Sequence, residues 1–373
     1  MAEYKTLVKK ISISPDKKTK QKDYLKKGQL AIVDQGQRIV SGYTNDTSMS
    51  VKCDLPVIVF GDHTRAVKYI TFPFGAGADG IKILQPKENI LPLYLYYGTQ
   101  YVVAKMPNRG YARHYQYVEK EDLPIPPLSE QERIVARIEE LFSQLDAGVE
   151  TLKKTKAQLA LYRQAVLKEA FADCADSVTI GSVATMIDPQ PSHRTPPEYE
   201  NGIPYIGIGD IDYTEKTIRA KEARKVSPTV YEEHLQRYTL HDGDFVMGKI
   251  GTIGKPFRLP LPQNYTLSAN VILIQPDAEK INPEYLFWQF SSPLVTEQLM
   301  EGKNETSQPA FGIQKARLLQ IKMCAPSDQD IIVSTIREKI SVCEHIEKTV
   351  TFALQQAEAM RQSILKDAFE GRL

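Results

Sequence analysis

The strongest constraint on the fold of this chain is a repeat that closes each of its halves. Residues 161–171 (LYRQAVLKEAF) return 198 residues later as residues 359–369 (AMRQSILKDAF), with six of the eleven positions identical. Upstream, SEQERIV at 129–135 aligns with SDQDIIV at 327–333 at the same offset of 198 residues. Solenoid repeats have periods of roughly 20 to 50 residues, so the large constant offset indicates two half-molecules. Each half is predicted to be a variable domain followed by the shared segment.

Each repeated segment has the signals of a helix that begins after a proline-rich stretch. The Pro-Ile-Pro-Pro sequence at 124–127 cannot lie inside a helix, because proline lacks the N–H and restricts the residue before it. Ser129 followed by Glu132 is a capping-box pattern, and Ser327 with Asp330 repeats it. Both helices are therefore expected to begin directly after their prolines.

From there, apolar residues recur with heptad spacing in each segment, which predicts a helix–helix seam. The two seams have the same length and are expected to bury each other as an antiparallel pair, each helix reaching roughly 60 Å at ~1.5 Å per residue. In that register Lys156 lies near Glu347, and the two are expected to form a register-setting pair. The predicted seam residues are Ile138, Phe142, Leu145, Val149, Leu152, Lys156, Leu159 and Val166 in the first helix and Ile336, Ile340, Glu347, Val350, Leu354 and Ile364 in the second.

The composition is that of an ordinary globular protein, with 373 residues, 42% of them hydrophobic and 25% charged. No apolar run approaches the ~20 residues that span a bilayer, and the first residues lack the apolar core of a signal peptide. A cytoplasmic protein without membrane contact is expected. The four cysteines form no CxxC pair, so neither a zinc site nor a disulfide framework is predicted, and no cofactor is expected.

The net charge of +1 is small for a nucleic-acid-binding protein, which usually carries an excess of positive charge. The charge is partly segregated, however, because nine lysines crowd residues 1–27 against three acidic residues. Such a run fits a solvated arm as well as it fits a surface that contacts phosphates.

Three short patterns bear on an alternative, a stand-alone DNA-modifying enzyme such as a methyltransferase or nuclease. Asn282-Pro-Glu-Tyr285 departs from the NPPY tetrapeptide of amino-methyltransferases at its third position and better fits the first turn of a helix. The glycine-rich stretch at 248–255 lacks the Lys-Ser/Thr ending of a phosphate loop. Pro-Asp at 276–277 with Glu301 and Lys303 formally fits a nuclease pattern, which is short and common.

The organisation as a whole resembles the specificity (S) subunit of type I restriction-modification systems. The resemblance covers the whole chain and is most specific in the helices, which read PIPPLSEQERIV at 124–135 and LKDAFEGRL at 365–373. The variable halves match more loosely. The matching residues are 42–43, 55–64 and 74–84 in the first half and the opening at 180–183, 202–206 and 209–211 in the second. The first half lacks that opening, so its relation to the second half is left open.

The two variable halves nevertheless share local marks. Residues 81–86 (IKILQP) parallel 271–276 (VILIQP) and are interpreted as buried strands. Residues 92–97 (PLYLYY) parallel 283–288 (PEYLFW) and are interpreted as the start of a helix packed on that strand. Each variable domain is therefore predicted to be mixed α/β.

The resemblance implies an α+β fold in which two mixed α/β target-recognition domains are separated by two long antiparallel, coiled-coil-like helices related by a pseudo-twofold repeat. The expected boundaries are 1–122 and 174–320 for the recognition domains and 123–173 and 321–373 for the helical segments. It further implies a non-catalytic protein that binds double-stranded DNA at a bipartite target, one half-site per domain. Its implied partners are two methyltransferase (M) subunits and, through them, restriction (R) subunits.

Two loops in corresponding places, 106–115 and 301–309, supply side chains that can reach base edges. Their compositions differ where their flanks agree, as expected if each reads a different half-site. The predicted first DNA surface consists of Arg65, Lys68, Asn108, Arg109, Arg113 and His114. The predicted second surface consists of Ser192, His193, Arg194, Lys249, Lys303, Asn304 and Gln308.

Overall fold

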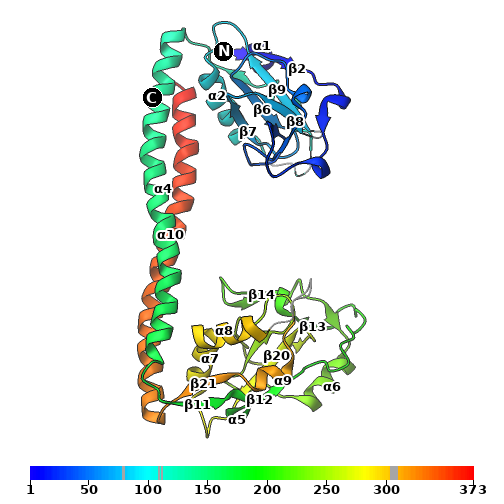
Figure 1. Ribbon diagram of the computed structural model, residues 1–373, viewed down its shortest axis with the longest axis vertical. Coiled ribbons are helices and arrows are strands. Elements are labelled where there is room, and N and C mark those ends of the chain that lie inside the picture. The colour runs from blue at the N-terminus through cyan, green and yellow to red at the C-terminus, as the bar shows by residue number, and fades with distance from the viewer. Residues whose placement is uncertain (78–79, 108–109, 111, 303–309) are drawn as a thin grey trace. The chain divides into compact units, whose positions relative to one another are not determined.

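The computed structural model describes all residues except 78–79, 108–109, 111 and 303–309, and its chain divides into two compact units. Unit 1 comprises Met1–Lys154 together with Val350–Leu373, and unit 2 comprises Thr155–Thr349. Two long helices, α4 (Leu128–Ala170) and α10 (Pro326–Phe369), each begin in one unit and end in the other (Figure 1). The boundary between the units therefore runs through both helices.

Unit 1 is built on a four-stranded antiparallel sheet with the order β2-β9-β6-β7. The strand β6 reads VIVFG, and all five of its residues are buried. Such a continuous apolar run is typical of a strand covered on both faces, whereas a half-exposed strand alternates. The four strands are β2 (Val8–Ile11), β9 (Ile81–Pro86), β6 (Val57–Gly61) and β7 (Val67–Ile70).

Smaller elements complete unit 1. A second sheet has the order β3-β8-β4-β5, in which β4 and β8 are parallel, and a short strand pair joins β1 to β10. These strands are β3 (Lys18–Thr19), β8 (Phe74–Gly77), β4 (Leu30–Val33), β5 (Gly42–Thr44), β1 (Ala2–Glu3) and β10 (Asp122–Leu123). The helices are α1 (Tyr4–Leu7), α2 (Pro92–Lys105) and α3 (Tyr115–Val118).

Unit 2 repeats this plan. Its main sheet has the order β12-β20-β17-β18, and its second sheet, β16-β13-β19, again contains a parallel pair. The strands of these sheets are β12 (Ala184–Ile187), β20 (Val271–Pro276), β17 (Phe245–Gly248), β18 (Phe257–Arg258), β16 (Lys225–Val226), β13 (Ile203–Ile206) and β19 (Thr266–Leu267). The remaining elements are the strand pairs β11 (Asp176–Thr179) with β21 (Gln320–Met323) and β14 (Ile211–Asp212) with β15 (Thr217–Ile218), and the helices α5 (Ile180–Val183), α6 (Pro228–Arg237), α7 (Pro283–Ser291), α8 (Pro293–Gly302) and α9 (Ile313–Arg317).

The opening of the two halves, which the sequence left unrelated, has one topology. In unit 1 the chain runs β1-α1-β2, and β1 pairs with β10 ahead of α4. In unit 2 it runs β11-α5-β12, and β11 pairs with β21 ahead of α10. The side chains differ, but the same pattern of short strand, single helical turn and sheet strand is built in both units.

The closing phenylalanine of each repeat inserts into the core of one unit. Phe171 packs edge-to-face on Tyr285 of α7, with ring centroids 5.2 Å apart. Phe369 lies 4.9 Å from Tyr94 of α2 and is stacked on Tyr101 at 5.3 Å. Burial of an aromatic side chain, with a further ~0.5–1.5 kcal/mol from the aromatic pairing, holds each helix end against its domain.

The tyrosines of this contact bind backbone at equivalent points. The Tyr94 hydroxyl donates to the Pro124 carbonyl at 2.9 Å, and the Tyr285 hydroxyl donates to the Lys322 carbonyl at 3.0 Å. The two carbonyls are themselves 198 residues apart. Gly98 permits the approach in unit 1, because a Cβ there would lie 3.1 Å from the Phe369 ring.

A buried glutamine near the start of each long helix completes this contact. Gln131 Oε1 accepts from the Leu91 N–H at 2.8 Å, and Gln329 Oε1 accepts from the Asn282 N–H at 2.9 Å. Each amide also donates to a carbonyl ahead of its own helix, that of Pro126 at 2.9 Å or Cys324 at 3.0 Å. We call the repeated phenylalanine, tyrosine and glutamine the helix joint of each unit.

The helix starts differ slightly from the capping-box prediction. The helices begin at Leu128 and Pro326, so Ser129 and Ser327 lie inside the first turn and not at the cap. The proline stretch precedes the first helix, as predicted. The polar residue that fastens each helix start is the glutamine two positions after the serine.

The helices run antiparallel within each unit, and a repeated arginine bridges them. In unit 2, Arg163 lies 2.8 Å from Glu347, while in unit 1 the equivalent Arg361 pairs with Asp146 and covers the Phe142 ring at 4.2 Å. This register differs from the predicted one, in which Glu347 pairs with Lys156.

Burial along the seam follows the heptad pattern closely. Lys156 is exposed, whereas the other predicted positions are buried or half-buried. The seam runs on both sides of the unit boundary. The buried positions are Ile138, Phe142, Val166, Ile336, Ile340 and Val350, and the half-buried ones are Leu145, Val149, Leu152, Leu159, Glu347, Leu354 and Ile364.

Replacing Gln329 with alanine is expected to lower the free energy of unfolding by about 1–3 kcal/mol, because the Asn282 N–H and the Cys324 carbonyl lose their partner in a buried place. Urea denaturation of the full chain measures the change. Gln355, exposed on the same helix, is the control, and Gln355→Ala is expected to change stability by less than about 0.5 kcal/mol. Equal losses of stability at both positions would contradict the stabilising role of Gln329 in the helix joint.

Reversing either charge of the Arg163–Glu347 pair is expected to destabilise the helices by about 0.2–1 kcal/mol, the scale of a partly exposed pair. The double reversal, Arg163→Glu with Glu347→Arg, is expected to recover most of that loss in a double-mutant cycle. Lys156→Glu serves as the control and is expected to be neutral. A double variant no more stable than the single ones would show that the register has another origin.

Candidate nucleic-acid interface

A buried charged residue follows a central strand in each main sheet. In unit 1, Asp62 comes directly after β6; its carboxylate lies 3.4 Å from Lys82 Nζ and accepts from the Tyr115 N–H at 2.9 Å. In unit 2, Lys249 comes directly after β17, and its Nζ lies 2.6 Å from Asp188 Oδ2. The position in the fold is the same, and the sign of the charge is opposite.

The backbone of these two residues anchors the segment that leads into the last small helix. The Asp62 carbonyl accepts from the His114 N–H at 2.8 Å, and His114 Nδ1 lies 3.0 Å from the same oxygen. In unit 2 the Lys249 carbonyl accepts from the Phe311 N–H at 2.9 Å. The chain therefore returns to equivalent points of the two sheets before α3 and α9.

Three of the predicted DNA contacts are buried residues with bonds inside the protein. Lys68, His114 and Lys249 are 4%, 1% and 9% exposed. Lys68 Nζ donates to the Asp34 carbonyl at 2.8 Å, because β7 alternates and places Lys68 on its inward face. These side chains hold the scaffold and do not present a free charge to a phosphate, which corrects their assignment to the surface.

The remaining predicted residues differ in their surroundings. Arg65 is half-buried and donates from its guanidinium to the Met106 carbonyl at 3.3 Å. The exposed residues are Arg113, Ser192, His193 and Arg194. The predicted Asn108, Arg109, Lys303, Asn304 and Gln308 lie outside the described residues.

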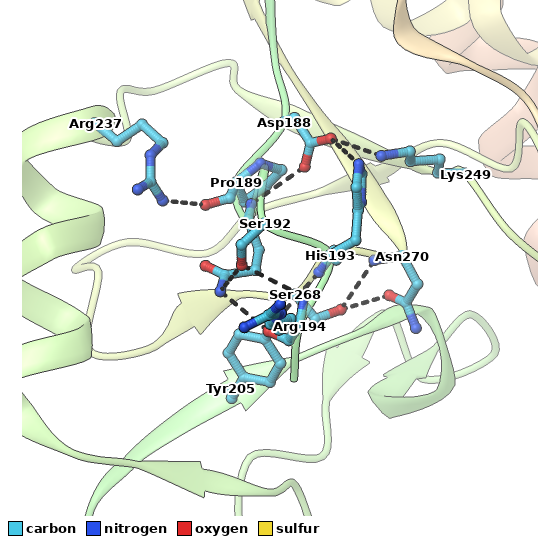
Figure 2. Close-up of polar contacts among 12 residues, drawn as sticks. Asp188, Pro189, Ser192, His193, Arg194, Tyr205, Arg237, Lys249, Ser268 and Asn270 are labelled. Carbon is cyan, nitrogen blue, oxygen red and sulfur yellow. Dashed lines mark hydrogen bonds and ion pairs between the residues drawn. The ribbon is translucent and has the colours of Figure 1, made fainter. Parts of the chain in front are cut away.

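Three of the exposed residues belong to one turn of unit 2, residues 188–194, whose start is held from two sides (Figure 2). On one side, Asp188 forms its ion pair with Lys249. On the other, Arg237 at the end of α6 donates to the Pro189 carbonyl at 2.7 Å. The base of the 188–194 turn is thus fixed to both the main sheet and α6.

The outer part of the turn is held by Gln190. Its Nε2 donates to Ser192 Oγ at 2.9 Å and to the Arg194 carbonyl at 3.1 Å, while its Oε1 lies 2.7 Å from Nε2 of the buried His234. Within this turn His193 has a φ of 53°. That left-handed conformation costs a non-glycine residue roughly 1–2 kcal/mol, so the surrounding bonds must hold it.

Gln190, His234 and Arg237 were not predicted from the sequence. Pro189 and Pro191 flank Gln190 and indicate a restricted turn. His234, however, is 44 residues away in the sequence, and no local pattern connects it to Gln190. Only the packing of α6 brings the two together.

Two of the three patterns that suggested an enzyme have structural roles, and the third includes Lys303, which lies outside the described residues. Asn282 caps α7, where its side chain accepts from the N–H groups of Glu284 at 2.8 Å and Tyr285 at 3.2 Å, as the helix-start interpretation predicted. The glycine-rich stretch is a tight turn, since a Cβ on Gly248 would lie 1.6 Å from the Thr252 carbonyl oxygen. Within the described ranges, no three His, Cys, Asp or Glu side chains gather as a metal site. In the same part of the chain, no helix combines the length and apolarity needed to cross a bilayer.

Comparisons with known proteins agree on one family. The family model described as "Type I restriction modification DNA specificity domain" matches residues 8–160. The EcoBI specificity subunit of Escherichia coli, a type I restriction enzyme component, is 23% identical over 278 residues, which are 67% of this chain and 58% of that protein. The EcoKI specificity subunit of Escherichia coli (strain K12) is 27% identical over 275 residues, 68% of this chain and 58% of that protein. The chain thus spans less than two thirds of the length of these relatives.

A solved structure described as "Structural basis underlying complex assembly and conformational transition of the type I R-M system" has the same fold. Its TM-score is 0.68 at 16% sequence identity, and the match covers 92% of both chains. Two mixed α/β units and a pair of long antiparallel helices therefore define a known two-domain α+β architecture. In sequence, the chain is similar to type I restriction-modification specificity subunits over the ranges given above.

Lowering the pH is expected to destabilise unit 2 through His234. Burial, with the neighbouring Arg237 charge, lowers the pKa of His234 below its ordinary value, so the folded state favours the neutral ring. The stabilisation is complete above the unfolded pKa of about 6.5 and is lost as the pH falls below it.

The thermal midpoint of the wild-type chain is therefore expected to fall more between about pH 7.5 and about pH 5.5 than that of His234→Gln. Burial raises the pKa of Asp244, which acts in the opposite sense, but it does so in both proteins. The difference between the two profiles isolates His234. Parallel profiles would show that this ring does not titrate in the folded chain.

Proposed function

We propose that this chain is the DNA-recognition subunit of a type I restriction-modification complex. It binds a bipartite target, one half-site at unit 1 and the other at unit 2, and leaves methylation and cleavage to partner subunits. The proposal rests on one observation: a scaffold is built twice, and the two copies differ where the loops leave the sheet. A duplicated scaffold whose two sets of loops differ suits a target whose two halves have different sequences.

The exposed side chains near these sheet ends are of the kinds that read DNA. In unit 2, the exposed Ser192, His193 and Arg194 belong to the 188–194 turn. In unit 1, Arg113 is exposed and directly precedes His114, which is bound to the Asp62 carbonyl. Arginine and serine can bond base edges in the major groove, and lysines position the backbone. Exposed lysines that could serve unit 1 in this way are Lys20, Lys22, Lys26 and Lys27.

The helices offer the surface for partner subunits. Tyr162 and Met360 occupy the same position of the repeat, and both are exposed, at 49% and 55%. Leu161 at 72% and Phe352 at 59% add further exposed apolar surface. Apolar side chains displayed on a helix pair are typical of a protein contact. Because the repeat presents the position twice, two methyltransferase subunits are proposed to bind, with restriction subunits attached through them.

The small net charge fits this division of labour. A protein that bound DNA alone would depend on its own cations for phosphate attraction, and this chain has only one net positive charge. In the proposed complex the partner subunits supply much of that attraction, and the S subunit supplies the choice of sequence. The alternative, a stand-alone enzyme, lacks support now that Asn282 is a helix cap and Gly248 a tight turn.

The experiment is DNA binding by the complex assembled with methyltransferase subunits, after its target has been found by mapping modified bases in a host that carries the system. Arg113→Ala is expected to weaken discrimination in one half-site and Arg194→Ala in the other, each by about 1–3 kcal/mol if the arginine contacts a base.

Lys87→Ala is the control for this experiment. Lys87 is exposed and follows β9 at Pro86, the end of that strand opposite the one paired with Gly61. It is therefore remote from the sheet end that Asp62 occupies. Loss of both half-sites in one arginine variant, or methylation or cleavage of DNA by the chain without partners, would overturn the proposal.

A further inference from the structure

We propose that His234 and Gln190 are positioning residues for sequence reading by unit 2. They form a one-directional chain of hydrogen bonds that starts on the buried strand β19 and holds the Ser192–Arg194 part of the turn in a single conformation. The inference rests on the proposed function and deepens it. It assigns to α6, through His234, the positioning of the side chains that contact the second half-site.

The direction of each hydrogen bond is set by backbone groups at the two ends. At the outer end, the Arg194 carbonyl can only accept, so the Gln190 amide must point its Nε2 towards it and its Oε1 towards His234. The Oε1 can only accept, so the His234 ring must carry its proton on Nε2. In the neutral ring, Nδ1 is then an acceptor.

The inner end completes the chain. His234 Nδ1 faces the Thr266 hydroxyl, which therefore donates to it. The Thr266 oxygen is left to accept from the Tyr238 hydroxyl, 2.9 Å away, and the Tyr238 oxygen accepts from the Leu267 N–H at 2.9 Å. Leu267 and Thr266 form β19, so the sequence of donors begins in the core and ends at the turn.

The turn needs such support because of the backbone of His193. Its φ of 53° is unfavourable for a residue with a Cβ, and the 192–194 segment is otherwise exposed. The two bonds from Gln190 Nε2 span this residue, one to Ser192 and one to Arg194. Without them the segment has other conformations available, and its side chains no longer meet a base edge in one geometry.

Arg237 and Lys249 have a different role. They hold the base of the turn, at Pro189 and Asp188, and neither bonds the 192–194 segment. The Gln190 side chain ties that segment to the buried His234 by two hydrogen bonds, whereas the other side-chain tie is a longer one, with His193 Nε2 3.9 Å from Asp188 Oδ2. Substitution of Gln190 is therefore expected to change the reading of DNA while the base of the turn and the fold stay in place.

The test uses the complex of the full chain with its methyltransferase subunits and three DNA duplexes: the mapped target, and the target with either half-site replaced. Gln190→Ala is expected to bind the full target about tenfold more weakly, the scale of one lost base contact. Its discrimination of the unit 2 half-site is expected to fall, while that of the unit 1 half-site stays at the wild-type value. The Tm is expected to fall by no more than a few degrees, because the buried His234 ring loses one hydrogen-bond partner.

Three further variants separate positioning from simple stability. Gln190→Glu can still accept from His234 but cannot donate to Ser192 or Arg194, so it is expected to behave like Gln190→Ala. His234→Gln can still donate to Gln190 and is expected to retain discrimination, whereas His234→Leu is expected to lose it. A loss that tracks Tm and falls equally on both half-sites would mark a merely structural role and overturn the proposal.

A second measurement does not depend on DNA. In the free chain labelled with ¹⁵N-histidine, His234 is expected to show the Nε2–H tautomer, and Gln190→Ala is expected to shift the Nε2 signal. If the ring is found in the Nδ1–H form, the hydrogen-bond chain is wrong whatever the DNA result. The Nε2–H form supports it.

Failure of this inference and failure of the proposed function give different results. If Gln190→Ala discriminates like the wild type while Ser192→Ala with Arg194→Ala loses the half-site, the positioning role is overturned and the proposed function stands. If none of these variants affects a complex that does bind its target, the turn is outside the interface and the inference is overturned. If the complex binds no DNA in preference to any other, both fall.

Discussion

The structure depends on a buried contact made twice, between the end of one long helix, the start of the other, and a domain. Phe171 or Phe369 supplies the apolar burial, Tyr285 or Tyr94 adds a ring and a hydrogen bond, and a glutamine satisfies backbone groups that the contact would leave unpaired. Unpaired groups at this depth cost free energy comparable to several ordinary contacts. The repeat in the sequence thus contains two parts of the helix joint, the phenylalanine and the glutamine, and each domain supplies the tyrosine.

Away from the helix joint the two units differ in sequence and in contacts. One such difference lies at the residue that directly follows β6 in unit 1 and β17 in unit 2. Asp62 and Lys249 occupy the same place, are both buried, and both anchor through a carbonyl the segment that follows. Each has its own partner of opposite charge. The same scaffold thus carries two different sets of loops. The buried charge at the start of each set is paired within its own unit, away from the helix joint.

Much of the framework could be predicted from the sequence, because helix and strand patterns are local. The heptads, the proline stops and the apolar runs of β9 and β20 are each recognised within one element. The opening of unit 1 was missed because its residues differ from those of unit 2 although its topology is the same. The candidate site was harder still: Lys68 and Lys249 are cations in suitable places, but the sequence does not show which face a side chain takes. The partners Arg163 and His234 are found only through packing across elements.

The course of the long helices between the units has a consequence for how the chain is made. Unit 2 is continuous in sequence, from Thr155 to Thr349, whereas unit 1 joins residues 1–154 to residues 350–373. During synthesis from the N-terminus, unit 2 has all of its residues while unit 1 still lacks Phe369 and the neighbouring core residues Leu365 and Ala368. The first domain to leave the ribosome is therefore the last to be completed, and until then Tyr94 and Tyr101 lack the Phe369 ring and expose an apolar surface.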